Sequence, residues 1–230
     1  FRGEYGFRYV VEQVGALLAE EKADVFCLEE FRTTSDYDTL QVVTMLGYPY
    51  AAYHESVAVL SRYPLSDTKA ILFKEKVPNK TNGAIRVDIT TPSGRVRLVA
   101  CHLQTTGLSS MERGYARDYG MRFVPFGRLS EGLTENARLR AIQADQIAAR
   151  AKNPTFPVIV AGDFNDIPSS YTYYVMTRVL EDTFRENGRG WGSTYRGAMG
   201  LLRLDYIFTS STLECTRCYS LDTELSDHKP

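Results

Sequence analysis

Short apolar segments that end in acidic, amide or histidine side chains recur along this chain, and they constrain its fold more than any other feature. The polar residues that follow such segments are Glu29, Glu30, His102, Asp163, Asn165 and Asp205, and Ser226-Asp227-His228 lies near the last residue. Short apolar runs of this kind are typical of buried strands. Because strand ends are rigid, we expect these side chains to converge on one cleft.

The periodicity of the remaining segments predicts helices interspersed among strands. The expected helices span residues 10–22, 37–46, 133–152 and 170–180. The expected strands span residues 24–28, 56–61, 85–89, 96–99, 157–161, 204–208 and 213–219. The pair 85–89 and 96–99 alternates apolar and polar residues around a Pro-Ser-Gly turn, which is typical of an antiparallel hairpin. This pattern predicts an α+β fold of two packed sheets covered by helices.

Length and composition are those of an ordinary globular domain. The chain has 230 residues, 43% of them hydrophobic, and we expect a single domain over residues 1–230. A net charge of −1 gives no general reason for a polyanionic partner, although a local basic site stays open. Cys27 and Cys101 lie in apolar runs and are expected to be buried thiols, whereas Cys215 and Cys218 form a single pair without the second pair of a structural zinc site.

The set of polar residues suits phosphoryl hydrolysis. That reaction needs a cation to neutralise the phosphate, a positioned water, and groups that transfer protons. Carboxylates suit Mg²⁺ or Mn²⁺, and histidine transfers protons near neutral pH. Each residue alone has an ordinary structural explanation, and Asp166 in particular precedes Ile-Pro-Ser-Ser and is expected to build a turn.

At these residues the chain resembles the endonuclease/exonuclease/phosphatase superfamily, which includes deoxyribonuclease I. The matching segments, in the family's order, are 23–30, 60–65, 101–103, 161–168, 203–208 and 226–228. The resemblance implies a four-layer α/β sandwich and a Mg²⁺- or Mn²⁺-dependent phosphoesterase. It is closest to bacterial members whose substrates are uncharacterised.

The resemblance also implies roles for individual residues. Glu30 would bind the metal, with Asp227 helping to hold the metal or the phosphate, and Glu29 stands where the family commonly has Gln. The catalytic residues would be His102 at the phosphate or leaving group, Asp163 and Asn165 at the water and phosphate, and Asp205 paired with His228.

Three further residues are candidates for the site. Arg62 would either support substrate binding from a strand end or form a structural salt bridge. Trp191, in the Gly-rich segment 188–195, would line the cleft unless that segment is only a tight loop. Glu55 would pair with His102.

The chain begins after the strand that bears a metal-supporting Asn in the family, and it stops before the family's last strand. We therefore expect residues beyond both ends. As it stands we expect a soluble domain, located in the cytoplasm or attached to a membrane if an upstream segment exists. No protein partner can be inferred.

The substrate is the open question. Arginines and aromatic residues alternate in segment 111–128, where they would grip phosphates and bases, touch lipid headgroups, or simply pack inward. The first hypothesis is a phosphodiesterase acting on nucleic acid. The alternatives are a phosphoesterase for a phospholipid headgroup or an inositol phosphate, and a non-catalytic binding module on the same fold.

Overall fold

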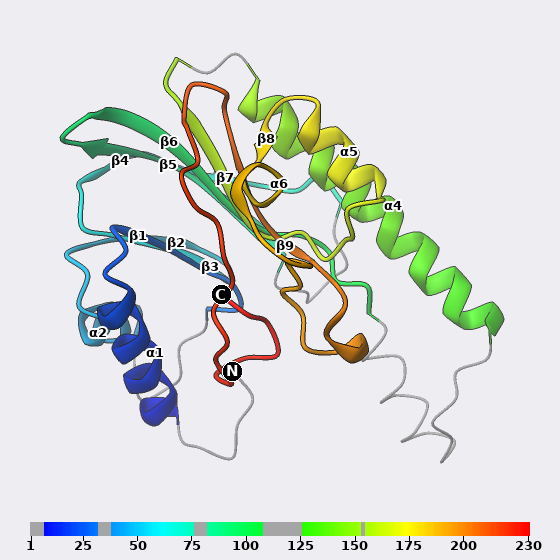
Figure 1. Cartoon of the computed structure of the whole chain (residues 1–230), viewed down its shortest axis with the longest axis horizontal. Coiled ribbons are helices and arrows are strands. Elements are labelled where there is room, and N and C mark those ends of the chain that lie inside the picture. Colours follow the sequence, from blue (N-terminus) through cyan, green and yellow to red (C-terminus); the bar gives the residue numbers. More distant parts are fainter. Residues whose placement is uncertain (1–6, 32–37, 76–81, 108–125, 153–154) are drawn as a thin grey trace.

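The computed structural model describes residues 7–31, 38–75, 82–107, 126–152 and 155–230 (Figure 1). Its helical elements are α1 (Phe7–Glu21), α2 (Thr39–Met45), α4 (Phe126–Ala151), α5 (Tyr171–Thr177), α6 (Thr183–Asn187) and the short 3₁₀ turn η1 (Ala198–Gly200). Its strands are β1 (Val25–Leu28), β2 (Tyr50–His54), β3 (Val57–Ser61), β4 (Leu65–Ile71), β5 (Gly83–Thr91), β6 (Gly94–His102), β7 (Val158–Asp163), β8 (Glu181–Asp182) and β9 (Asp205–Thr209).

The strands form two sheets. The smaller sheet has the order β1-β3-β2 and is antiparallel. The larger sheet has the order β4-β5-β6-β7-β9-β8, and only its β6–β7 pair is parallel. The parallel pair follows from the long α4 crossover between β6 and β7, because parallel neighbours need such a connection.

Four layers result, because each central strand is covered on both faces. Val57 and Val59 of β3 pack against the larger sheet, whereas Ala58 and Leu60 pack against α1 and α2. In the same way Val99 and Cys101 of β6 belong to the cluster that includes α4 and α5. Figure 1 shows α1 and α2 outside the smaller sheet and α4 and α5 outside the larger one. The expected α+β sandwich is therefore confirmed.

Most expected elements are present. The expected strands appear as β1, β3, β5, β6, β7 and β9, and all four expected helices appear, with α4 beginning earlier and α5 ending earlier than predicted. Ser170 caps α5 through the N–H of Tyr173, as the serines before this helix suggested. The strands β2, β4 and β8 were not predicted. Most residues of β2 and β4 are exposed, and β8 has only two residues.

The prediction of a strand at residues 213–219 is wrong. The structure has no strand there, because the segment packs against α6 instead of joining a sheet. The carbonyl oxygen of Cys215 accepts Nδ2 of Asn187, and its Sγ donates to the carbonyl oxygen of Thr183 at 3.7 Å. Most of segment 111–128, with its arginines and aromatic residues, lies outside the described residues. Among the helices that the structure describes, none is long and apolar enough to cross a membrane.

Candidate active site

Four residues of neighbouring strands form one row across the larger sheet. Gly83 of β5 pairs with His102 of β6, His102 pairs with Asp163 of β7, and Asp163 pairs with Asp205 of β9. Directly paired residues project from the same face of a sheet. Sheet register therefore brings together three of the predicted site residues, His102, Asp163 and Asp205.

Gly162 allows β7 to run close to β6 just before Asp163. Its φ of 142° is one that other residues rarely adopt, and a Cβ at this position would lie 1.9 Å from the carbonyl oxygen of Cys101. A larger residue would push the two strands apart. Gly162 thus helps to determine the position of Asp163.

Asp163 and Asn165 hold each other in place. The backbone N–H of Asn165 donates to Oδ1 of Asp163 at 2.7 Å, and its Nδ2 donates to Oδ2 at 2.9 Å. Asn165 Nδ2 also donates to the carbonyl oxygen of Leu103 at 3.2 Å. Nε2 of His102 lies 3.7 Å from Oδ2 of Asp163. All three polar side chains are buried, so their orientation is set before any ligand binds.

Asp205 and His228 form the second pair of the site. Nδ1 of His228 lies 2.8 Å from Oδ2 of Asp205. The end of segment 188–195 supports this pair: Thr194 Oγ1 accepts the N–H of Asp205 at 3.1 Å, and the ring of Tyr195 lies 5.0 Å from that of His228. The Gly-rich segment therefore contributes to the site through its last two residues.

Glu29, and not Glu30, faces the cluster. Strand residues alternate between faces, and Cys27 packs between the sheets while Leu28 packs against the helices. Glu29 continues the side of Cys27, and its carboxylate interacts electrostatically with Asp205 and His228. Glu30 has a φ of 52° and lies at the surface.

The cluster carries more negative charge than its burial favours. Burial, and next the charge of Asp205, raise the pKa of Glu29 to about 8. The same two causes raise the pKa of Asp163 well above its usual range. Burial lowers the pKa of His228, but the hydrogen bond to Asp205 and the charges of Asp205 and Asp163 outweigh it and raise this pKa to about 9. The imidazolium of His228 thus lies among carboxyl groups whose combined negative charge it only partly balances.

These residues fit a divalent cation. Carboxylate oxygens of Asp163 and Asp205 and a ring nitrogen of His228 lie within 4.8 Å of one another. Oε1 of Glu29 is buried and has no hydrogen-bond partner within the described part of the chain. Asp227 is exposed, but its charge also acts on His228. Hard cations such as Mg²⁺ and Mn²⁺ prefer oxygen-rich sets of this kind.

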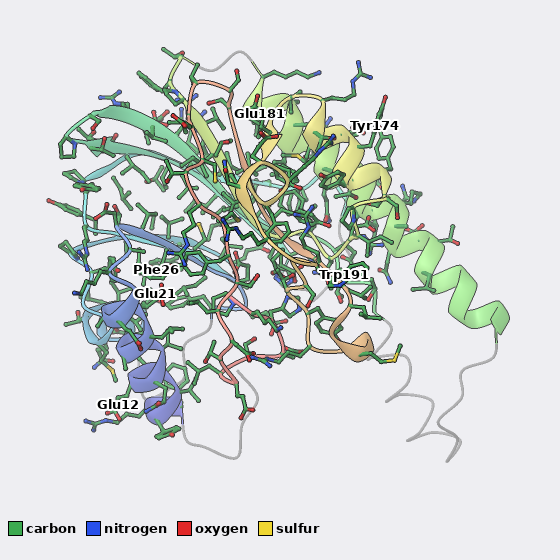
Figure 2. All side chains as sticks on the ribbon, in the orientation of Figure 1. Glu12, Glu21, Phe26, Tyr174, Glu181 and Trp191 are labelled. Atoms are coloured by element: carbon green, nitrogen blue, oxygen red, sulfur yellow. The ribbon has the colours of Figure 1, made fainter. Side chains whose placement is uncertain are left out.

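Two predicted substrate-binding residues lie apart from the cluster. Arg62 follows the end of β3 that pairs with Val25, whereas Glu29 lies beyond the opposite end of β1. The guanidinium of Arg62 stacks on Tyr48 at 5.9 Å, and the residue is exposed. Trp191, labelled in Figure 2, is 89% exposed in the loop between α6 and β9. Within the described part of the chain, neither residue makes a hydrogen bond or ion pair with the polar row.

Glu55 lies closer to its expected place. Its Oε2 would be 3.4 Å from a Cβ at Gly83, the residue that pairs with His102. The absence of a side chain at Gly83 therefore gives the Glu55 carboxylate room beside the row.

Sequence reasoning missed the place of Glu29 and the support from Thr194 and Tyr195. The sequence contains a signal for Glu29, because the alternation of strand residues continues from Cys27 to Glu29 and places both on the side that faces the larger sheet. The signal for Thr194 was weaker, since a threonine in a Gly-rich loop has no preferred partner. Only the folded chain brings its hydroxyl to the N–H groups of Leu204 and Asp205.

The comparison with known proteins agrees with this geometry. The sequence profile of the Endonuclease/Exonuclease/phosphatase family matches residues 5–228, so this chain belongs to that family. Membership supports a hydrolase of the phosphoesterase or nuclease type. A search of curated proteins finds none that matches the chain.

Solved structures share the fold at low sequence identity. Truncated Caenorhabditis elegans TDP2 superposes with a TM-score of 0.67 at 14% identity, covering 99% of this chain and 90% of that one. A family protein from Leptotrichia buccalis gives 0.65 at 15% identity, covering 96% and 90%. The human Nocturnin catalytic domain with bound sulfate gives 0.62 at 17% identity, covering 98% and 86%. At these identities the likeness shows the fold alone.

Proposed function

We propose that this protein is a divalent-metal-dependent phosphoesterase that hydrolyses a phosphodiester by in-line attack of water. The observation that carries the proposal is the cluster of buried Asp163 and Asn165 with half-buried Asp205 and His228, in which carboxylates outnumber the one imidazolium. A phosphodiester brings a further negative charge, so a cluster of this composition needs a cation before it can accept the substrate.

The metal would be held by carboxylates of the cluster. Glu29, Asp163 and Asp205 offer carboxylate oxygens, and Asp227 next to His228 is a further proposed ligand. When bound, Mg²⁺ or Mn²⁺ neutralises charge on the phosphate and stabilises the leaving oxygen. The family resemblance instead favours Glu30, so Glu29 and Glu30 are the two candidates for this metal ligand.

The residues of the chain supply orientation and proton transfer. Asp163, held at both oxygens by Asn165, is placed to orient the attacking water. In its ionised form, which a bound cation would favour, it would also accept the proton of that water, because a carboxylate with a raised pKa is a stronger base. His228 is cationic at neutral pH and is oriented by Asp205, so it is suited to bind a phosphate oxygen. His102, one strand away, is the proposed group at the other phosphate oxygen or the leaving group.

The substrate class that the family favours is a phosphodiester, with nucleic acid as the leading candidate. The test is hydrolysis of a panel by the purified protein: plasmid DNA, an abasic-site duplex, bis-p-nitrophenyl phosphate, sphingomyelin and an inositol polyphosphate. Each is assayed with Mg²⁺, with Mn²⁺ and with EDTA. Cleavage of a diester that EDTA abolishes is the expected result, and cleavage that survives EDTA would contradict the metal requirement.

A further inference from the structure

A small cavity opens beside the polar row, on the β5 side of His102. Its volume is about 60 Å³. A water-sized group needs roughly 10–15 Å³ of such space, so the cavity has room for a few non-hydrogen atoms. It is lined by polar residues from the β2–β3 turn and the start of β5 and by apolar residues at the end of β4, namely His54, Glu55, Asn82, Ile71, Leu72 and Phe73.

Asn82 presents an acceptor that the protein leaves unused. The residue is only 3% exposed, and its Nδ2 donates to the carbonyl oxygen of Leu103 at 2.7 Å. This bond fixes the amide, and Oδ1 is left buried with no hydrogen-bond partner in the described residues. A buried acceptor without a partner costs about 1–3 kcal/mol. A ligand group that donates a hydrogen bond to Oδ1 would remove that cost.

The other polar group of known charge in the cavity is also an acceptor. The carboxylate of Glu55 lies against Gly83 and has two oxygens, each able to accept more than one hydrogen bond. Acceptors on one side and the apolar side chains of Ile71, Leu72 and Phe73 on the other are suited to a carbon skeleton that carries hydroxyl groups. A phosphate or a carboxylate only accepts and would gain no hydrogen bond from Asn82 Oδ1 or Glu55, although His54, whose Nε2 lies 3.9 Å from Oε1 of Glu55, also lines the cavity.

The cavity is joined to the catalytic cluster by a single carbonyl group. The oxygen of Leu103 accepts Nδ2 of Asn82 at 2.7 Å and Nδ2 of Asn165 at 3.2 Å. Asn165 in turn holds Asp163. Gly83, which lines the cavity, also pairs with His102, so the cavity adjoins the row within the sheet.

We infer that this cavity is a subsite for a hydroxyl-bearing ester group of the substrate, recognised by Asn82 Oδ1 and the Glu55 carboxylate. The inference rests on the proposed phosphodiesterase function and adds the chemistry of one ester group to it. A ribose hydroxyl and a glycerol or inositol hydroxyl share this chemistry. A deoxy group at the same place leaves Oδ1 without a donor.

The test compares two esters that differ only in hydroxyl groups: p-nitrophenyl 2,3-dihydroxypropyl phosphate and p-nitrophenyl propyl phosphate. We expect kcat/KM with Mg²⁺ to be about ten-fold higher for the dihydroxy ester, as for one well-made hydrogen bond. Leu72→Trp, at a residue 68% exposed, fills the cavity without removing a polar group and should bring the ratio near one. Leu40→Trp, at a residue 75% exposed on α2, is the matched control and should keep the ratio.

Equal rates for the two esters, or a preference that survives Leu72→Trp, would overturn the subsite. A calorimetric comparison of 2,3-dihydroxypropyl phosphate with propyl phosphate separates the subsite from the chemistry. If neither ester is hydrolysed but the dihydroxy compound binds more tightly and Leu72→Trp removes the difference, the subsite stands and the proposed function fails. Equal binding in that case would overturn both. A ribodinucleotide and its deoxy analogue, followed by glycerophosphoinositol, then distinguish the natural sources of the hydroxyl.

Discussion

Asp163 and Asp182 are buried aspartates of the same sheet, but their surroundings differ. Asp182, in β8, accepts from both terminal nitrogens of Arg203, at 3.2 and 2.5 Å, and from the Tyr173 hydroxyl at 2.8 Å. Its Oδ1 also caps α6. Asp163 accepts only from Asn165 within the described residues and faces two other carboxylates, Asp205 and Glu29.

The difference separates a structural carboxylate from one that awaits a ligand. Asp182 has its charge balanced by the protein, so its contacts stabilise the fold as they stand. Asp163 has its geometry fixed but its charge unbalanced, so its contacts are complete only with a cation or proton. Burial alone would not distinguish the two residues, since both are under 10% exposed.

Replacing Asp163 should produce the largest effect. Asp163→Asn is expected to lower metal-dependent turnover of bis-p-nitrophenyl phosphate by about a thousand-fold, because it removes a proton acceptor and a ligand oxygen. Because the native carboxylate is buried with a raised pKa, the metal-free variant should melt at the same or a higher temperature. Turnover retained within about ten-fold would remove Asp163 from the chemistry.

Replacing Asp182 should have the opposite result. Asp182→Ala leaves the buried Arg203 without its partner and is expected to lower the free energy of unfolding by about 3–5 kcal/mol. Denaturant titration measures this loss. The double variant Asp182→Leu with Arg203→Met should recover part of the stability, and no recovery would mean that packing, rather than the ion pair, dominates here.

Glu29 and Glu30 offer a matched pair at the metal. Glu29→Gln is expected to weaken Mn²⁺ binding by on the order of ten-fold, since it removes a buried anionic oxygen. Glu30→Gln, at the surface, should change it by less than about two-fold. Calorimetric titration of both variants decides, and the reverse order would assign the metal to Glu30.

The smallest effect is a pH dependence of the metal-free protein. The pKa of His228 is raised from 6.5 to about 9, so the stability it contributes is fully present below about pH 6.5 and is lost as the pH rises through 9. The melting temperature should fall across this range, and NMR should show the His228 ring titrating near 9. Asp205→Asn should move that titration toward 6.5, and an unchanged titration would contradict the pairing.

The sequence predicted the parts of the site that depend on strands with two buried faces. His102, Asp163 and Asp205 end or begin runs that must be strands, and parallel or antiparallel pairing then brings them into one row. Asn165 and His228 lie in the segments that carry the family resemblance, and the structure places both beside this row. The placement could be anticipated because burial of both strand faces leaves a continuous apolar signal, whereas the roles of these residues stay predictions.

The sequence says less where the placement of a residue depends on a one-residue choice or a distant contact. Glu29 and Glu30 are chemically alike, and only the inner face of β1 distinguishes them. Arg62 also ends an apolar strand, but β3 runs antiparallel to β1, so this end lies away from Glu29. The segment 213–219 carries apolar residues like a strand, yet it contacts α6 instead of a sheet. The partner that decides each case is remote in sequence.

The row from Gly83 to Asp205 makes the arrangement of the proposed catalytic groups a property of hydrogen-bond register. A slip of one residue between β6 and β7 would turn His102 and Asp163 to opposite sides of the sheet while leaving most of the apolar contacts possible. Enzymatic activity would therefore report on correct strand alignment more sensitively than circular dichroism or compactness. For the same reason, ordering of the catalytic groups needs little conformational entropy beyond that already lost when the sheet forms.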